Sequence, residues 1–201
     1  YTDHGIDHVQ SVLNTAQEII SEKSWKILTP EDIYVLTSSI LLHDCAMHLS
    51  KKGLWELLKN DRYNGVLLGF DNEEEWEKKW EKYGSDVKKF DESDWVSFFG
   101  EYITVVLPQI GDASLEDNQK IIIGDFVRKH HACIAQVIAT YGMPTQEGAH
   151  EIFNSDFSYL NQLSGLVARS HNHKLREVVD ILGDHRARDH RGTHPAYLMG
   201  V

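Results

Sequence analysis

The sequence has few of the features that mark membrane proteins or disulfide-rich secreted proteins. It holds only two cysteines, Cys45 and Cys133, both in apolar and helix-like surroundings, and two such cysteines do not make a disulfide framework. No apolar run approaches the roughly 20 residues that a membrane-spanning helix needs, and the first residues do not resemble a signal peptide. We therefore expect a reducing, cytoplasmic setting and no membrane partner.

Positive charge is also scarce, because 20 lysines and arginines face 31 acidic residues and the net charge is −11. This argues against a general nucleic-acid-binding surface, so long duplex nucleic acid is the least expected partner. The charge is uneven, however: residues 128–201 hold eight bases against seven acids. An anionic substrate would meet this part of the chain most readily, although an ordinary solvated surface explains the same distribution.

Proline is rare, and no stretch shows a credible run of alternating strands or a nucleotide-binding glycine-rich loop, so the sequence predicts an all-α fold. The helix that follows the Thr29 cap is apolar almost all round, and we expect it to be the most buried one. The expected helices cover residues 9–24, 30–42, 114–141, 154–168, 175–182 and the first turns of 195–201.

Residues 51–115 differ in texture from the rest and are predicted to form an insertion in a single domain whose core comprises 1–50 and 116–201. Short helical pieces are expected at 54–58, 73–82 and 95–107. Four of the five tryptophans lie in the insertion, and Trp76 and Trp80 are spaced to share a helix face. They could form a lid or a surface for a neighbouring domain or protein partner; a small satellite core explains them as well.

The adjacent pair His43 and Asp44 stands at the end of the apolar helix 30–42. Two ligand-type side chains beside a buried helix are costly unless something pairs them. A divalent metal ion suits imidazole and carboxylate together, whereas a hydrogen-bonded structural pair is the alternative. His8, in the first turn of the first helix, is a second candidate ligand or a residue at the edge of the core.

Two further helices carry an arginine and a histidine close together. Arg128, Lys129 and His131 interrupt an apolar helix, with Arg128 and His131 three residues apart and therefore on one face. Arg169 and His171 end another buried helix. A phosphate beside a metal would explain bases in such positions; a solvated stripe is the alternative.

Taken in order, these residues resemble the HD-domain superfamily of all-helical, metal-dependent phosphohydrolases. The likeness covers most of the chain except about 51–115, and the nearest likeness is to large HD domains beside chaperone-type ATPase modules. It implies an HD-domain helical bundle in which His8, His43 and Asp44 are metal ligands. It makes His131 and His171 candidates for a second metal or for holding substrate.

The resemblance also implies a chemistry. Its cofactor would be a divalent ion (Mn, Fe, Co, Ni, Zn or Mg), and its substrate a small phosphorylated compound or a nucleotide. Asp44, Arg128 and His131 are the candidate catalytic residues, with Asp44 able to orient or deprotonate a water molecule. Lys129 and Arg169 are the candidate substrate-binding residues, because both can hold phosphoryl oxygens.

One element of the family pattern is not found, namely the aspartate on a final core helix that closes the metal site. The sequence ends on what resembles the approach to it, so we expect either a fragment or a degenerate site; Asp184 and Asp189 are the nearby substitutes. Two rival interpretations follow. One is a catalytically degenerate sensing or protein-interaction module, and the other is a structural helical domain with satisfied core histidines.

Overall fold

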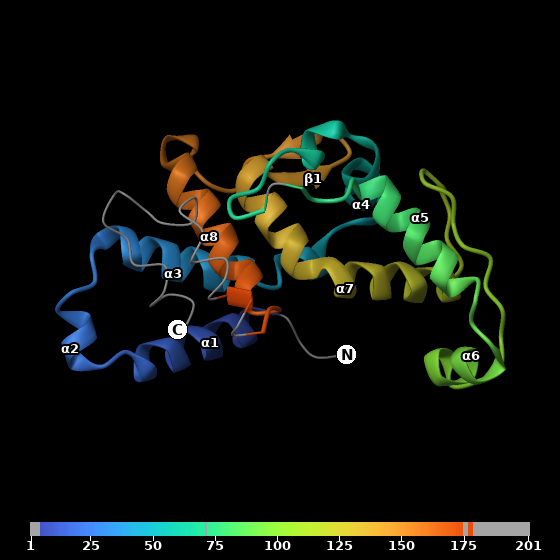
Figure 1. Ribbon diagram of the computed structural model, residues 1–201, viewed down its shortest axis with the longest axis horizontal. Helices are drawn as coiled ribbons and strands as arrows, with labels where there is room; N and C mark the ends of the chain where they lie inside the picture. Colours follow the sequence, from blue (N-terminus) through green and yellow to red (C-terminus); the bar gives the residue numbers. More distant parts are fainter. Residues whose placement is uncertain (1–4, 71, 175–176, 179–201) are drawn as a thin grey trace.

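The computed structural model describes residues 5–70, 72–174 and 177–178. Its helices are arranged in an elongated body, with α1 (Ile6–Ile19), α2 (Glu22–Trp25), α3 (Pro30–Leu42) and α8 (Ser158–Ser170) toward one end. The long helix α7 (Asp117–Tyr141) leads from there to the segment around α5 (Trp76–Val87) and α6 (Glu92–Phe99), as Figure 1 shows. The prediction of a helical fold is confirmed, with one short hairpin added to the helices.

The helix expected over 9–24 is divided into α1 and α2, with a break at Ile20 and Ser21, whereas α3 begins where local chemistry predicts. Thr29 and Asp32 form a reciprocal capping box with Pro30 in the first turn of α3. Contrary to expectation, α3 is not buried all round, since Leu41 is 51% exposed in the described structure. Its buried face packs against α8 through Val35, Leu163 and Leu166.

The helices α7 and α8 pack closely against each other at Gly165. A Cβ added at Gly165 would lie 2.8 Å from the Ala139 Cβ and 3.1 Å from the Gln136 Cα. Only the absence of a side chain therefore lets the two helices meet at this distance. This contact sets the position of His131 on α7 relative to the end of α8.

A 3₁₀ turn, η1 (Cys45–His48), precedes the segment 51–115 that was predicted to be an insertion. This segment contains α4 (Lys51–Lys59), η2 (Asp61–Asn64), α5 and α6. Its four tryptophans are at most 7% exposed. They belong to the same hydrophobic cluster as Leu42, Ile134 and Ala168 of the predicted core. The expected satellite core is thus continuous with the main core, and a partner of the insertion would meet side chains other than these indoles.

Three local expectations were wrong. A short hairpin of β1 (Met143–Thr145) and β2 (Gly148–His150) follows α7, before η3 (Ser155–Phe157). The helix expected over 73–82 begins only at Trp76, and α6 ends at Phe99 because Gly100 adopts a left-handed conformation with φ of 82°. The segment that was expected to continue as helix to residue 107 is irregular.

The helix expected over 175–182 lies largely outside the described residues, and the turns expected over 195–201 lie wholly outside them, as do Asp184 and Asp189. Among the described helices, none is both long enough and apolar enough to cross a membrane.

Candidate metal centre

Five side chains that the sequence singled out converge at one place. His8 lies in the first turn of α1, His43 caps the C-terminus of α3, and Asp44 follows it directly. His131 comes from the middle of α7, and His171 caps the C-terminus of α8. Residues up to 163 positions apart in the sequence are therefore brought into one cluster.

Asp44 is the centre of this cluster. Its Oδ2 lies 3.0 Å from the Nε2 of His43 and 3.4 Å from the Nε2 of His8, and its Oδ1 lies 3.7 Å from the Nε2 of His131. The Nε2 atoms of His131 and His171 are 2.8 Å apart. Two three-residue groups thus share Asp44, and within each group the ligand atoms lie within 4.8 Å of one another.

Backbone hydrogen bonds determine which ring nitrogen faces the cluster. The Nδ1 of His43 lies 2.6 Å from the carbonyl oxygen of Ile40, and the Nδ1 of His131 lies 2.6 Å from the carbonyl oxygen of Arg128. The Nδ1 of His171 contacts the carbonyl oxygen of Ala168. A carbonyl oxygen only accepts, so each Nδ1 carries the proton and donates it. In the neutral ring, each Nε2 then presents a lone pair to the other ligands, as in the supported histidines of metal sites.

The electrostatics of the cluster favour a cation. Burial, together with the nearby rings of His131 and His43, holds the pKa of His171 below its ordinary value, so its neutral, ligand form is favoured. His43 and His171 stand at the C-termini of α3 and α8, where the helix dipole is negative. Nε2 lone pairs 2.8 Å apart repel unless a proton or cation lies between them. The donor set therefore fits a divalent metal ion.

Cys45, next to Asp44, is not a candidate thiolate ligand. Burial and the Asp44 carboxylate raise the pKa of its thiol to about 12. It remains protonated near neutral pH.

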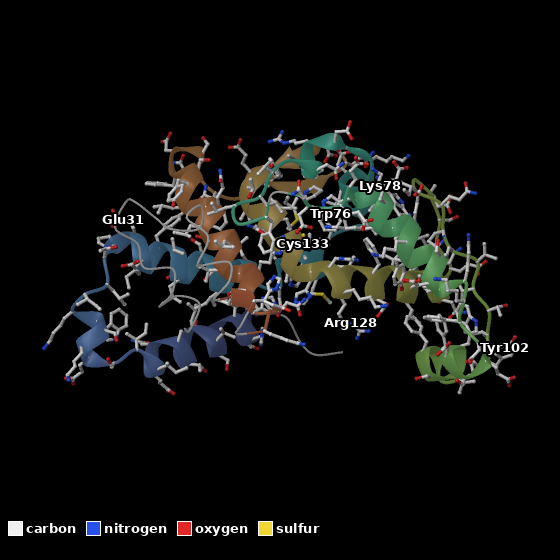
Figure 2. All side chains as sticks on the ribbon, in the orientation of Figure 1. Glu31, Trp76, Lys78, Tyr102, Arg128 and Cys133 are labelled. Atoms are coloured by element: carbon white, nitrogen blue, oxygen red, sulfur yellow. The ribbon has the colours of Figure 1, made fainter. Side chains whose placement is uncertain are left out.

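The bases of α7 point elsewhere. The guanidinium of Arg128 pairs with the buried carboxylate of Asp125 at 3.0 Å, and Lys129 pairs with the other oxygen of Asp125 at 3.0 Å. Both side chains are more than half exposed. Figure 2 shows Arg128 at the edge of α7, away from Trp76 and Cys133. Their catalytic and substrate-binding roles stay predictions.

Arg169 lies within the protein. Its side chain is 10% exposed, its guanidinium stacks 3.5 Å above the Phe70 ring, and it donates hydrogen bonds to Gln136 and to Glu73 of the insertion. Its substrate-binding role also stays a prediction. The structure assigns it at least one definite task, which is to join α8, α7 and the insertion.

Sequence reasoning missed the partners of these bases. Asp125 stands three and four residues before Arg128 and Lys129, a spacing that could have revealed the ion pairs. Glu73 and Lys79 pair with each other at 2.7 Å and reach the α7–α8 region from the insertion. Glu73 is 96 positions from Arg169 in the sequence, so no local pattern could have indicated their contact.

A cavity of about 450 Å³ opens beside the cluster between α1, α3 and α8. His8, His43 and His171 line one part of it, and apolar residues such as Val12, Ile40 and Val167 line another. A ligand in this cavity would place a polar group against the histidines and an apolar group against the helices.

A comparison with protein-family models matched the HD-CE family over residues 1–201. Neither the curated proteins nor the solved structures to which the chain was compared gave a match.

Proposed function

Because the chain belongs to the HD-CE family, an HD-domain-type family, we propose that it is a metal-dependent phosphohydrolase acting on a small phosphorylated substrate or a nucleotide. The observation that carries this proposal is the convergence of histidine Nε2 atoms on Asp44, with Nδ1 of three of the rings bound to backbone carbonyls. A purely structural cluster would have no need to present several lone pairs to one point.

The ligand set divides around Asp44. His8 and His43 with Asp44 would hold one ion, and Asp44 with His131 and His171 a second. Mn, Fe, Co, Ni, Zn and Mg are the candidate metals, and nitrogen-rich ligands favour the transition metals over Mg. A bound divalent ion would lower the pKa of a water molecule and neutralise phosphate oxygens.

The residues of the chain would do the rest of the work. Asp44 would accept a hydrogen bond from the attacking water and so orient it, or take its proton. His131 is a candidate for the same region as a ligand or an acid–base group. Lys129 and Arg128, which are exposed on α7, would attract the anionic substrate.

The first test is metal content, measured by elemental mass spectrometry on the purified chain after loading with Mn or Ni. We expect stoichiometric metal in the wild type and its loss in a His43→Ala/Asp44→Ala double variant. His150→Ala, which changes an exposed histidine on β2, is the matched control and should keep the metal. Loaded protein would then be assayed against a panel of nucleotides and phosphoesters.

The outcomes separate the rival functions. Metal without turnover on any phosphoester would favour a sensing or protein-interaction module. No metal in either protein after loading would contradict the proposal and leave a structural helical domain.

A further inference from the structure

A second cavity, of about 240 Å³, lies where the start of α5 meets α7 and the end of α8. Its lining residues are close in sequence to two of the proposed ligands. His130 and Ala132 flank His131, Arg169 stands two residues before His171, and Asn172 follows it directly. Figure 2 shows Trp76 of α5 and Cys133 of α7 in this central region. Of the cavity's lining residues, the function proposed above uses only Lys129, as an exposed base that attracts the substrate.

The cavity is cationic in an acidic protein. Its lining includes the permanently positive side chains of Lys79, Lys129 and Arg169 and a single carboxylate, Glu73. The chain as a whole carries a net charge of −11. Glu73 pairs with Lys79 and Arg169, and Asp125 pairs with Lys129. These two carboxylates face three cations, so the region keeps a net positive charge that attracts anions.

Two of these cations are held inside the protein. The side chains of Lys79 and Arg169 are each 10% exposed. The Nζ of Lys79 also lies 4.5 Å from the centre of the Trp76 ring and 3.8 Å from the Sγ of Cys133. Aromatic and thiol neighbours leave the ammonium poorly hydrated, which strengthens its attraction for an anion.

Glu73 shows what this arrangement binds. One of its carboxylate oxygens lies 2.5 Å from Nη2 of Arg169, and the other lies 2.7 Å from Nζ of Lys79. It is an oxyanion gripped by two cations, as a phosphate would be. Glu73 belongs to residues 72–75, which have no regular secondary structure and precede α5.

His130 completes the lining of the cavity from α7. Lys129 stands at the exposed side, where its Nζ bonds Asp125 and lies 4.8 Å from the centre of the Tyr83 ring. His173 and Asn172 contribute polar edges from the end of α8.

We propose that this cavity binds a second phosphate group of the substrate, next to the phosphoester held at the metal centre, with Lys79 and Lys129 as its contacts. The substrate class is then a diphosphate or another compound with two neighbouring phosphate groups. This inference rests on the proposed function for its meaning, but anion binding itself requires no metal. Lys79 comes from the insertion, which would therefore contribute to substrate choice.

The test is titration calorimetry with inorganic pyrophosphate on the metal-free chain in EDTA. Lys79→Gln should weaken binding by about 10-fold, the loss of one charge-assisted hydrogen bond of about 1.5 kcal/mol. Lys78→Gln is the matched control, because Lys78 neighbours it on α5 but is 60% exposed and pairs with Glu75. It should change the affinity less than about twofold.

Three further variants provide independent tests if Lys79→Gln folds poorly. Lys129→Gln, on the exposed side, should weaken binding severalfold, whereas Lys120→Gln, an exposed pair partner of Asp117 on the same helix, should not. Glu73→Gln removes the competing carboxylate and should tighten binding severalfold. Thermal melting of every variant would verify folding.

Equal affinities of Lys79→Gln and Lys78→Gln, or weaker binding by Glu73→Gln, would overturn the cavity proposal. Its failure is distinguishable from failure of the proposed function. Metal binding and turnover without pyrophosphate binding would reject the cavity alone, whereas pyrophosphate binding by a chain that takes up no metal would reject the hydrolase alone.

Discussion

At the scale of single residues, His171 is the proposed metal ligand whose loss should be the most selective. His171 contributes to the group with Asp44 and His131, whereas His8 and His43 form the other group with Asp44. His171→Gln should therefore reduce bound metal from about two ions to about one per chain and lower phosphoester turnover by about 100-fold. Elemental analysis and a turnover assay would measure both effects.

His150→Gln should leave metal content and turnover unchanged. Complete loss of metal in His171→Gln would show that the two groups do not bind independently.

Glu73 should stabilise the fold in a pH-dependent way. Burial alone would raise the pKa of its carboxyl, but hydrogen bonds and charges from Lys79 and Arg169 outweigh it and hold the pKa below the ordinary value of 4.5. A lowered folded-state pKa stabilises the protein above the unfolded-state value, and this stability is lost as the pH falls through the folded-state value. Glu73→Gln should thus cost about 2–3 kcal/mol at pH 7.

Denaturant titrations at pH 7 and at successively lower pH would follow the difference between wild type and Glu73→Gln. The difference should shrink below about pH 4.5. A difference that stays constant down to pH 3 would show that the ion pairs do not carry it.

What the sequence could reveal at this scale depended on spacing. The adjacency of His43 and Asp44 and the shared helix face of Arg128 and His131 singled out part of the cluster. The resemblance to the HD-domain superfamily supplied the expected roles of His8, His131 and His171. The orientation of Arg128 toward Asp125, and of Arg169 toward Glu73, depends on how elements pack. That packing is a property of the folded chain, and the sequence carried no local sign of the second contact.

At the scale of elements, the packing of α7 against α8 should tolerate little added volume at Gly165. An alanine Cβ at position 165 would lie 2.8 Å from the Ala139 Cβ, so Gly165→Ala should push the helices apart and cost about 1–3 kcal/mol. Because α8 ends at His171, the same change should weaken metal binding. Denaturant unfolding and metal titration would measure the two effects.

Gly124→Ala is the opposite case, at an exposed position of α7 away from its contact with α8. Gly124 is exposed on α7, and an added Cβ would meet no atom within 4 Å. This change should stabilise the protein by about 0.5–1 kcal/mol, since alanine favours a helix over glycine. Equal effects of the two substitutions would argue against the close approach at Gly165.

Element ends were predictable where side chains cap the backbone, as Thr29 and Asp32 do for α3. They were missed where the signal was weak. Glu73 to Glu75 favour a helix by composition, yet Glu73 is extended toward Arg169, and the gain from two ion pairs outweighs one helical turn. The hairpin of β1 and β2 is only three residues on each side, too short to show an alternating pattern.

At the scale of the whole molecule, the insertion and the HD core should unfold together. Leu57 of α4 and Ile134 of α7 are fully buried in one continuous hydrophobic cluster. Leu57→Ala should therefore destabilise the entire chain by about 2–5 kcal/mol. Tryptophan fluorescence, which reports mainly on the insertion, and far-ultraviolet circular dichroism should give coincident transitions in both proteins.

Two separated transitions would show that the insertion folds independently of the HD core. The single-domain organisation was expected from length and composition, but the shared core was not. Alternation of apolar and polar residues shows which faces are buried, not which elements they are buried against.

The spread of the cluster along the chain also has a consequence for synthesis. His8 and His43 are 35 positions apart and His131 and His171 are 40 apart, so each half lies within a separate stretch of chain. As the polypeptide leaves the ribosome, the half with His8, His43 and Asp44 emerges long before α8 exists. A nascent chain would therefore capture the first of the two proposed ions early, whereas the second would bind only after His171 has been translated and α8 has docked on α7.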